Sequence, residues 1–297
     1  MLHKRLLRHP RHWIAAGFIS VAGAVGYTQL DEWQRQRIFS PETSQRWWRE
    51  APQGTEIFDL TLPNGHHVRT WYWQHPESDA PTVLYLHGAR WNLHGSVFRM
   101  ERWMDMGFSV LAIDYRGFGD STQLLPSEQS AFEDSLAALN ELAGRQPDPG
   151  KRFIYGHSLG GAIAIDLAAR ADDISVAGIV VESSFTSIRD MMTTLSWGDL
   201  PGAGLLVTQS FASNRKLAAI TKPLLIIHGT ADQVVPHTMS DELFKSATSV
   251  PKGLKRLVKI EGASHSGSVR SPEYEDAVRE FTNVAIRFAK GIQAAGR

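Results

Sequence analysis

Cysteine is absent from this chain of 297 residues. Its absence excludes disulfides, thiol chemistry, cysteine-ligated zinc and lipid attachment through cysteine. Excess charge is also absent, because 31 Lys and Arg residues balance 31 Asp and Glu residues. Without a basic footprint we expect no nucleic-acid partner. Metal-ligand spacings such as HExxH, internal repeats and low-complexity tracts are missing as well, and we expect no metal site.

Long hydrophobic runs are scarce, and the one that stands out lies at the N-terminus. Residues 1–12 carry four basic side chains and no acid, and residues 13–30 carry no charge. Eighteen helical residues span about 27 Å, close to the thickness of a bilayer core. We therefore predict that residues 1–30 form a signal anchor or transmembrane helix, followed by a juxtamembrane connector at 31–54. The remaining domain, 55–297, would lie on the non-cytoplasmic side, the periplasm in a bacterium.

Two other interpretations of this N-terminal segment stay open. The small residues Ala22, Gly23 and Ala24 suit cleavage by a signal peptidase, which would release a secreted protein. An ordinary helix buried in the fold is the second alternative.

The rest of the chain alternates strand and helix patterns. Hydrophobic residues make up 42% of the sequence, enough for a substantial core. Strands are predicted at 57–62, 68–73, 82–86, 109–113, 153–155, 176–181, 223–227 and 257–260, and helices at 96–106, 127–145, 160–170, 238–249 and 273–290. This order predicts an α/β domain with a mostly parallel, eight-stranded sheet flanked by helices. Residues 185–221 interrupt the rhythm and are interpreted as a small cap or as a plain crossover.

The most specific motif is Gly156-His157-Ser158-Leu159-Gly160. It lies between a predicted strand and a predicted helix, the setting of a nucleophile elbow. Glycine permits the tight turn that lifts Ser158 above the sheet, and the helix N-terminus favours developing negative charge. We predict that Ser158 is a catalytic nucleophile. An ordinary serine in a glycine-rich turn is the alternative.

A nucleophilic serine needs a base, and the base needs a carboxylate that orients it. Asp232 follows one buried strand and His265 follows the last strand, in the chain order serine, acid, histidine. We predict Asp232 as the acid and His265 as the base. His237 is the rival base, and Glu182 and Asp190 are rival acids.

The oxyanion of an acyl-transfer intermediate needs two backbone N–H donors. Leu159 directly follows the nucleophile, and Ala89 lies in the loop after the third strand, so we predict these two N–H groups. Supporting roles are expected for three further side chains: His157 at the turn, His228 bound to backbone at a strand end, and Arg116 tying loops together near the nucleophile.

Taken together, YLHGA, DYRGFGDS, GHSLG, HGTADQVVP and GASHS resemble the α/β-hydrolase superfamily over about residues 55–290. With ESSFTSIRD and the N-terminal hydrophobic segment, the chain is similar to the membrane-anchored, Bem-type serine hydrolases related to the mammalian ABHD proteins. The resemblance implies an α/β-hydrolase fold, chemistry on carboxylic esters or thioesters, and the triad Ser158, Asp232 and His265. Arg90-Trp91 departs from the small or amide residues that often follow the His-Gly start.

We therefore expect a serine hydrolase that acts on a small-molecule or lipid-like acyl ester through an acyl-enzyme, without a metal or organic cofactor. A serine peptidase on the same fold, a non-catalytic scaffold and a cofactor-free haloperoxidase are the alternatives. Acyl length, leaving group and oligomeric state stay open.

Overall fold

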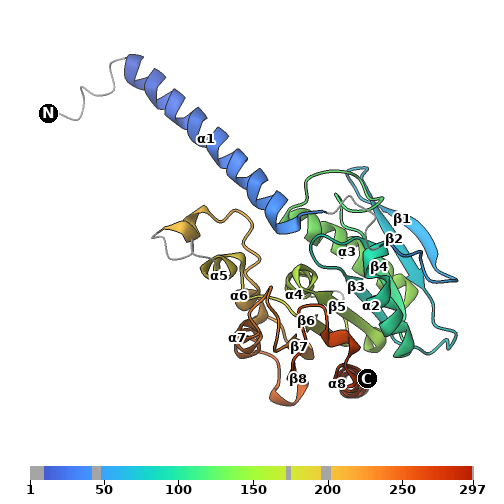
Figure 1. Ribbon diagram of the computed structural model, residues 1–297. Helices are drawn as coiled ribbons and strands as arrows, with labels where there is room; N and C mark the ends of the chain where they lie inside the picture. Colours follow the sequence, from blue (N-terminus) through green and yellow to red (C-terminus); the bar gives the residue numbers. More distant parts are fainter. Residues whose placement is uncertain (1–9, 42–47, 172–174, 195–201, 296–297) are drawn as a thin grey trace.

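A computed structural model describes residues 10–41, 48–171, 175–194 and 202–295, apart from the side chains of residues 10–22, 203 and 295. Its centre is an eight-stranded sheet in the order β1-β2-β4-β3-β5-β6-β7-β8 (Figure 1). The strands are β1 (Glu56–Thr61), β2 (His67–Trp73), β3 (Thr82–Leu86), β4 (Ser109–Ile113), β5 (Arg152–His157), β6 (Gly178–Glu182), β7 (Leu224–Gly229) and β8 (Lys255–Ile260).

The sheet is parallel from β4 to β8, whereas β2 pairs antiparallel with both β1 and β4. Strands β3, β4, β6 and β7 are buried at every residue. Their apolar runs reflect this burial, because a parallel strand is covered on both faces. The prediction of a mostly parallel, eight-stranded sheet is confirmed.

Helices cover both faces of the sheet. On one face, α2 (Leu93–Asp105) and α8 (Pro272–Ala295) pack against the strands. On the other lie α3 (Glu128–Arg145), α4 (Leu159–Arg170), α6 (Ser213–Leu217) and α7 (Thr238–Ser246). Because β3 to β8 run parallel, their carboxyl ends lie at the same edge of the sheet. Folds of this kind bind ligands at that edge.

The N-terminal segment forms the long helix α1 (Pro10–Phe39). No helix in the described part of the chain is long and apolar enough to cross a membrane. The side chains of residues 10–22, on which much of the predicted anchor falls, lie outside that part. The second half of α1 carries Asp31, Glu32, Arg35 and Arg37, which makes it polar. The structure therefore does not support the predicted transmembrane helix, and the location of the domain stays a prediction.

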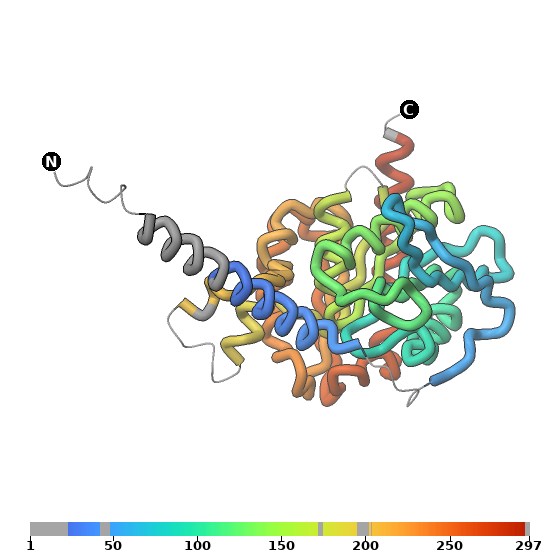
Figure 2. Tube along the Cα trace, turned by 90° about the horizontal axis from the view of Figure 1, so that it is seen from above, coloured from blue at the N-terminus to red at the C-terminus, as the bar shows by residue number. Residues whose placement is uncertain are grey.

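The end of α1 packs into the body of the domain (Figure 2). Phe39 is fully buried and contacts the rings of Phe118 and Phe211. Its carbonyl accepts a hydrogen bond of 2.9 Å from the backbone N–H of Arg90. This contact fixes α1 to the loop between β3 and α2.

The segment between β6 and β7 contains α5 (Ile188–Thr193) and a short turn at Ala203–Leu206. Residues 195–201, in the middle of the predicted cap, lie outside the described residues. Gln34 of α1 donates to the carbonyl of Leu206 and accepts from the N–H of Thr208. Helix α1 and this segment therefore pack against each other beside the sheet.

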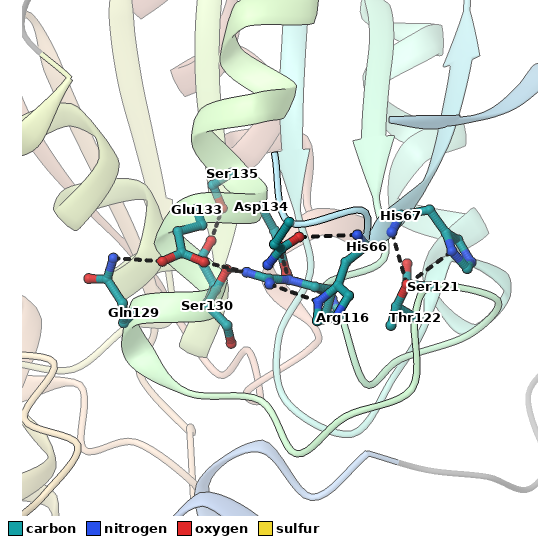
Figure 3. A network of polar contacts seen from close by, with 12 residues as sticks. His66, His67, Arg116, Ser121, Thr122, Gln129, Ser130, Glu133, Asp134 and Ser135 are labelled. Carbon is teal, nitrogen blue, oxygen red and sulfur yellow. Dashed lines mark hydrogen bonds and ion pairs between the residues drawn. The ribbon is translucent and has the colours of Figure 1, made fainter. Parts of the chain in front are cut away.

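Arg116, in the loop after β4, is the centre of a buried polar network (Figure 3). Its Nε lies 2.6 Å from Asp134 Oδ1 and its Nη2 lies 2.6 Å from Glu133 Oε2, both on α3. Its Nη1 lies 3.3 Å from His66 Nδ1, in the turn between β1 and β2. As predicted, Arg116 joins separate segments, here the β1–β2 turn, the loop after β4 and α3. The expected position near the nucleophile is not borne out, because none of its contacts among the described residues is to the turn at Ser158.

We expect Arg116→Ala to destabilise the domain strongly. The Arg116 and Asp134 side chains are 3% and 0% exposed, and removal of the guanidinium leaves the carboxylate buried without its counter-ion. Breaking such a buried pair costs about 3–5 kcal/mol. Urea unfolding followed by circular dichroism measures the loss. Arg256→Ala, which removes an exposed ion pair with Glu280, is the control and should cost less than about 1 kcal/mol. Equal losses would show that the Arg116 network contributes no special stability.

Candidate active site

The turn from β5 into α4 holds Ser158 in a strained conformation. Its φ of 55° lies in a region that L-residues rarely adopt. The strain is held in place by its surroundings, because the Ser158 N–H donates to Glu182 O and the Ser158 carbonyl accepts from Gly161 N–H and Ser184 Oγ. Strain that tertiary contacts maintain in this way is typical of a functional position.

Glycine at both ends of the motif lets the turn close. A Cβ on Gly156 would lie 2.1 Å from the carbonyl oxygen of Gly160. A Cβ on Gly160 would lie 2.1 Å from the carbonyl oxygen of Leu86. Since both obstacles are backbone atoms, neither clash can be relieved by a change of rotamer. The predicted elbow geometry is therefore present.

We expect Gly156→Ala to cost about 3 kcal/mol or more, because the backbone of the elbow must move to admit the methyl group. Gly144→Ala is the matched control: Gly144 lies in α3, and a Cβ there would meet nothing within 4 Å. That variant should be neutral or more stable by up to about 1 kcal/mol. Urea unfolding midpoints compare the two, and equal midpoints would contradict the steric argument.

Asp232 and His265 lie together at the carboxyl ends of β7 and β8. His265 Nδ1 donates to Asp232 Oδ2 over 2.7 Å. His228 Nε2 donates to the same oxygen over 3.0 Å, and Asp232 Oδ1 accepts from the N–H groups of Val234 and Val235. Burial favours protonation of Asp232, but these hydrogen bonds outweigh it and hold the pKa well below its ordinary value. The carboxylate therefore stays ionised at neutral pH.

His157 and His228, for which we predicted supporting roles, position the groups around this pair. His228 Nε2 contacts the backbone at Val235 O, as expected, and also Asp232. His157 Nε2 donates to the carbonyl of His265 over 3.0 Å, which joins the elbow to the His265 loop. Burial, with Arg99 and His265 nearby, holds the pKa of His157 well below its ordinary value, so this imidazole is neutral.

Ser158 directly follows β5 and His157, whose ring centroid lies 5.0 Å from that of His265. Its side chain is half-buried, and Ser158 Oγ forms no hydrogen bond to any residue that the structure describes. The contact between His265 and Asp232 is therefore present, whereas the one between His265 and Ser158 is not. Hydrogen bonds of this kind often tighten only when substrate binds.

The two predicted oxyanion donors belong to residues close to the nucleophile, since Leu159 follows Ser158 directly and Ala89 follows Gly88. Gly88, next to Ala89, approaches Ser158 closely enough that a Cβ on it would lie 3.3 Å from Ser158 Cβ. The N–H groups of Ala89 and Leu159 donate to no other group among the described residues. Both donors are thus unused by the protein itself.

Two residues that sequence reasoning did not single out hold the Ala89 loop in place. Asp114 Oδ1 accepts from the N–H of Leu93 over 2.9 Å and lies 3.4 Å from His87 Nε2. The Tyr115 hydroxyl donates to the carbonyl of His87 over 3.1 Å. Both belong to the DYRGFGDS motif, so the motif was visible, but its contact partners depend on β4 lying beside β3.

The rival residues are engaged elsewhere. Glu182 is buried, where it accepts from Arg99 and from the Tyr155 hydroxyl. Asp190 lies in the first turn of α5. His237 contacts Lys259 through its ring and its carbonyl. The backbone carbonyl of Glu182 accepts from the Ser158 N–H. Among the described residues, no side chain of these three contacts Ser158, Asp232 or His265.

The fold agrees with similarities to known proteins. The uncharacterized protein Rv2307c of Mycobacterium tuberculosis is 32% identical over 247 residues, which cover 79% of this chain and 82% of that protein. A family model described as serine aminopeptidase, S33, matches residues 77–207. The chain belongs to the α/β-hydrolase superfamily.

Other relatives of this α/β-hydrolase carry more informative names. The lysophosphatidylserine lipase ABHD12 of Rattus norvegicus is 30% identical, over 79% of this chain and 61% of that protein. The Pyrococcus furiosus esterase Pf2001 shares the fold with a TM-score of 0.62 at 19% identity, over 77% of this chain and 89% of that one. The relatives therefore include hydrolases of esters, and this α/β-hydrolase is a hydrolase by family.

Proposed function

We propose that this α/β-hydrolase is a serine hydrolase that cleaves carboxylic esters or thioesters through an acyl-enzyme. The observation that carries the proposal is the arrangement of three groups at one sheet edge. Ser158 occupies a strained elbow, and the ionised Asp232 holds His265 Nδ1–H at 2.7 Å. With Nδ1 protonated, the other ring nitrogen, Nε2, is free to accept a proton.

The reaction would proceed in two halves. Ser158 Oγ attacks the acyl carbon while His265 Nε2 takes its proton, and the N–H groups of Ala89 and Leu159 bind the oxyanion. His265 then passes the proton to the departing alcohol or thiol. Water hydrolyses the acyl-enzyme by the same steps, with His265 again as the base. The chain's own residues suffice for every step.

Peptide hydrolysis is the second candidate, and a specific observation favours it: the matching family model is described as a serine aminopeptidase. A fluorophosphonate probe tests for the activated serine that both candidates share. Rates on p-nitrophenyl esters and on aminoacyl p-nitroanilides then separate them. We expect labelling of the wild type and faster turnover of esters. A folded wild type that does not label would favour a non-catalytic scaffold.

A further inference from the structure

A cavity of about 300 Å³ adjoins the proposed site, between α2 and the loop that follows His265. Three of its lining residues are arginines: Arg49, Arg99 and Arg270. None of its lining residues is acidic. Aromatic side chains, including Trp91 and Phe98, form much of the remaining wall. A small cavity with several cations and apolar walls suits an anionic group attached to a compact organic body.

Arg99 places a buried cation at the cavity wall. Its side chain is 3% exposed. Nη1 donates to Glu182 over 2.6 Å, while Nη2 is buried and has no hydrogen-bond partner in the structure. Burial opposes its charge, but Glu182 outweighs burial and raises the pKa of Arg99. A buried charged donor without a hydrogen-bond partner is costly, and an anion in the adjoining cavity would offset part of that cost electrostatically.

Arg270 and Arg49 are the two other cations. Arg270 is exposed on the loop after His265, and no carboxylate pairs with it among the described residues. Arg49 Nη1 lies 3.5 Å from Glu101, and both of those side chains are about half exposed. Arg270 is therefore the cation most available to a ligand in the cavity.

The cavity lies close to groups that we propose take part in the reaction. Gly88, His157 and Ser266 line it. Gly88 approaches Ser158, and Ser266 follows His265, the group that would protonate the leaving alcohol. The cavity therefore adjoins the loops that carry the proposed nucleophile and the proposed base.

We propose that this cavity binds an oxyanion, a carboxylate or a phosphate, carried by the alcohol part of the ester. The inference rests on the proposed function. Its substrates would be esters of hydroxy acids or of phosphorylated alcohols, and the anion would contact Arg270, with the buried Arg99 guanidinium adding positive charge behind the cavity wall. Charged hydrogen bonds of this kind distinguish strongly between an anion and a neutral isostere.

Two matched acetyl esters test the proposal. 4-Acetoxybenzoate carries a carboxylate on its leaving group, and methyl 4-acetoxybenzoate is the neutral analogue. The readout is the ratio of kcat/KM for the anionic ester to that for the neutral ester. We expect Arg270→Gln to lower this ratio about tenfold, mainly through KM, because one charged hydrogen bond is lost. Added salt should lower the wild-type ratio as well.

Arg287→Gln is the control, since Arg287 is an exposed residue of α8 that does not line the cavity. Its ratio should match the wild type. Arg99 is not substituted, because its removal would leave the Glu182 carboxylate buried without its counter-ion. If both esters are hydrolysed and the ratio is the same in Arg270→Gln and the wild type, the proposal fails while the proposed function stands.

Ligand binding tests the cavity without turnover. Calorimetry with 4-hydroxybenzoate, phenyl phosphate and methyl 4-hydroxybenzoate compares carboxylate, phosphate and neutral forms. We expect each anion that binds to have about tenfold higher affinity for the wild type than for Arg270→Gln. The anion with the higher affinity shows whether the cavity prefers a carboxylate or a phosphate. If neither ester is hydrolysed, the proposed function fails for these esters, and this binding difference still supports the anion site. Equal affinity for all three compounds overturns the anion site.

Discussion

Ser158→Ala lowers kcat on p-nitrophenyl esters by at least about 10⁴-fold, the loss expected when an activated nucleophile is removed. Fluorophosphonate labelling disappears in the same variant. Stability should change little, because Ser158 Oγ has no hydrogen-bond partner among the described residues. Alanine also retains the Cβ that lies beside Gly88. The loss is therefore chemical, not structural.

Two controls make this result specific. Circular dichroism and the unfolding midpoint of Ser158→Ala should match the wild type. Ser264→Ala, at an exposed serine next to His265, should keep both labelling and turnover. Wild-type ester hydrolysis by Ser158→Ala would remove this serine from the mechanism and leave the strain at the elbow without a catalytic explanation.

Asp232→Asn should lower kcat by about 10⁴-fold. The carboxylate accepts four hydrogen bonds, two from His265 and His228 and two from the N–H groups of Val234 and Val235. An amide has one acceptor atom and one donor atom, so either orientation places its NH₂ against N–H donors. If the NH₂ faces His265, Nδ1 becomes the acceptor and Nε2 carries the proton. His265 can then no longer accept a proton from Ser158.

The measurement is kcat on p-nitrophenyl acetate, with fluorophosphonate labelling as a second readout. Asp190→Asn is the matched control, since Asp190 lies on α5 and forms no contact with His265 among the described residues. It should retain wild-type rates. Wild-type activity in Asp232→Asn together with loss in Asp190→Asn would reverse the assignment of the acid.

The strands and the elbow were predictable because their causes are local. A strand covered on both faces must be apolar along its whole length, so β3, β4, β6 and β7 were visible as Val-, Ile- and Leu-rich runs. The turn at Ser158 needs glycine at residues 156 and 160, and both glycines lie within one motif of five consecutive residues. Chain order then placed Asp232 and His265 at strand ends.

Contacts between distant segments were not predictable. Asp114 holds the loop that carries Ala89 because β4 lies beside β3, and pairing of strands is not encoded in either strand alone. The N-terminal segment shows the same limit. An uncharged run predicts a hydrophobic helix but does not reveal that the helix continues to Phe39 and that this ring packs between Phe118 and Phe211.

By itself, then, the sequence determined the α/β architecture, the elbow at Ser158 and the candidates for acid and base, because each depends on short-range patterns and chain order. Only the tertiary structure decided that Asp232, rather than Glu182, holds His265, and that the buried Arg99, with Nη2 unpartnered, lies in the wall of a cavity. Hydrogen bonds reach about 3 Å, so which groups pair is decided by folding and not by distance along the chain.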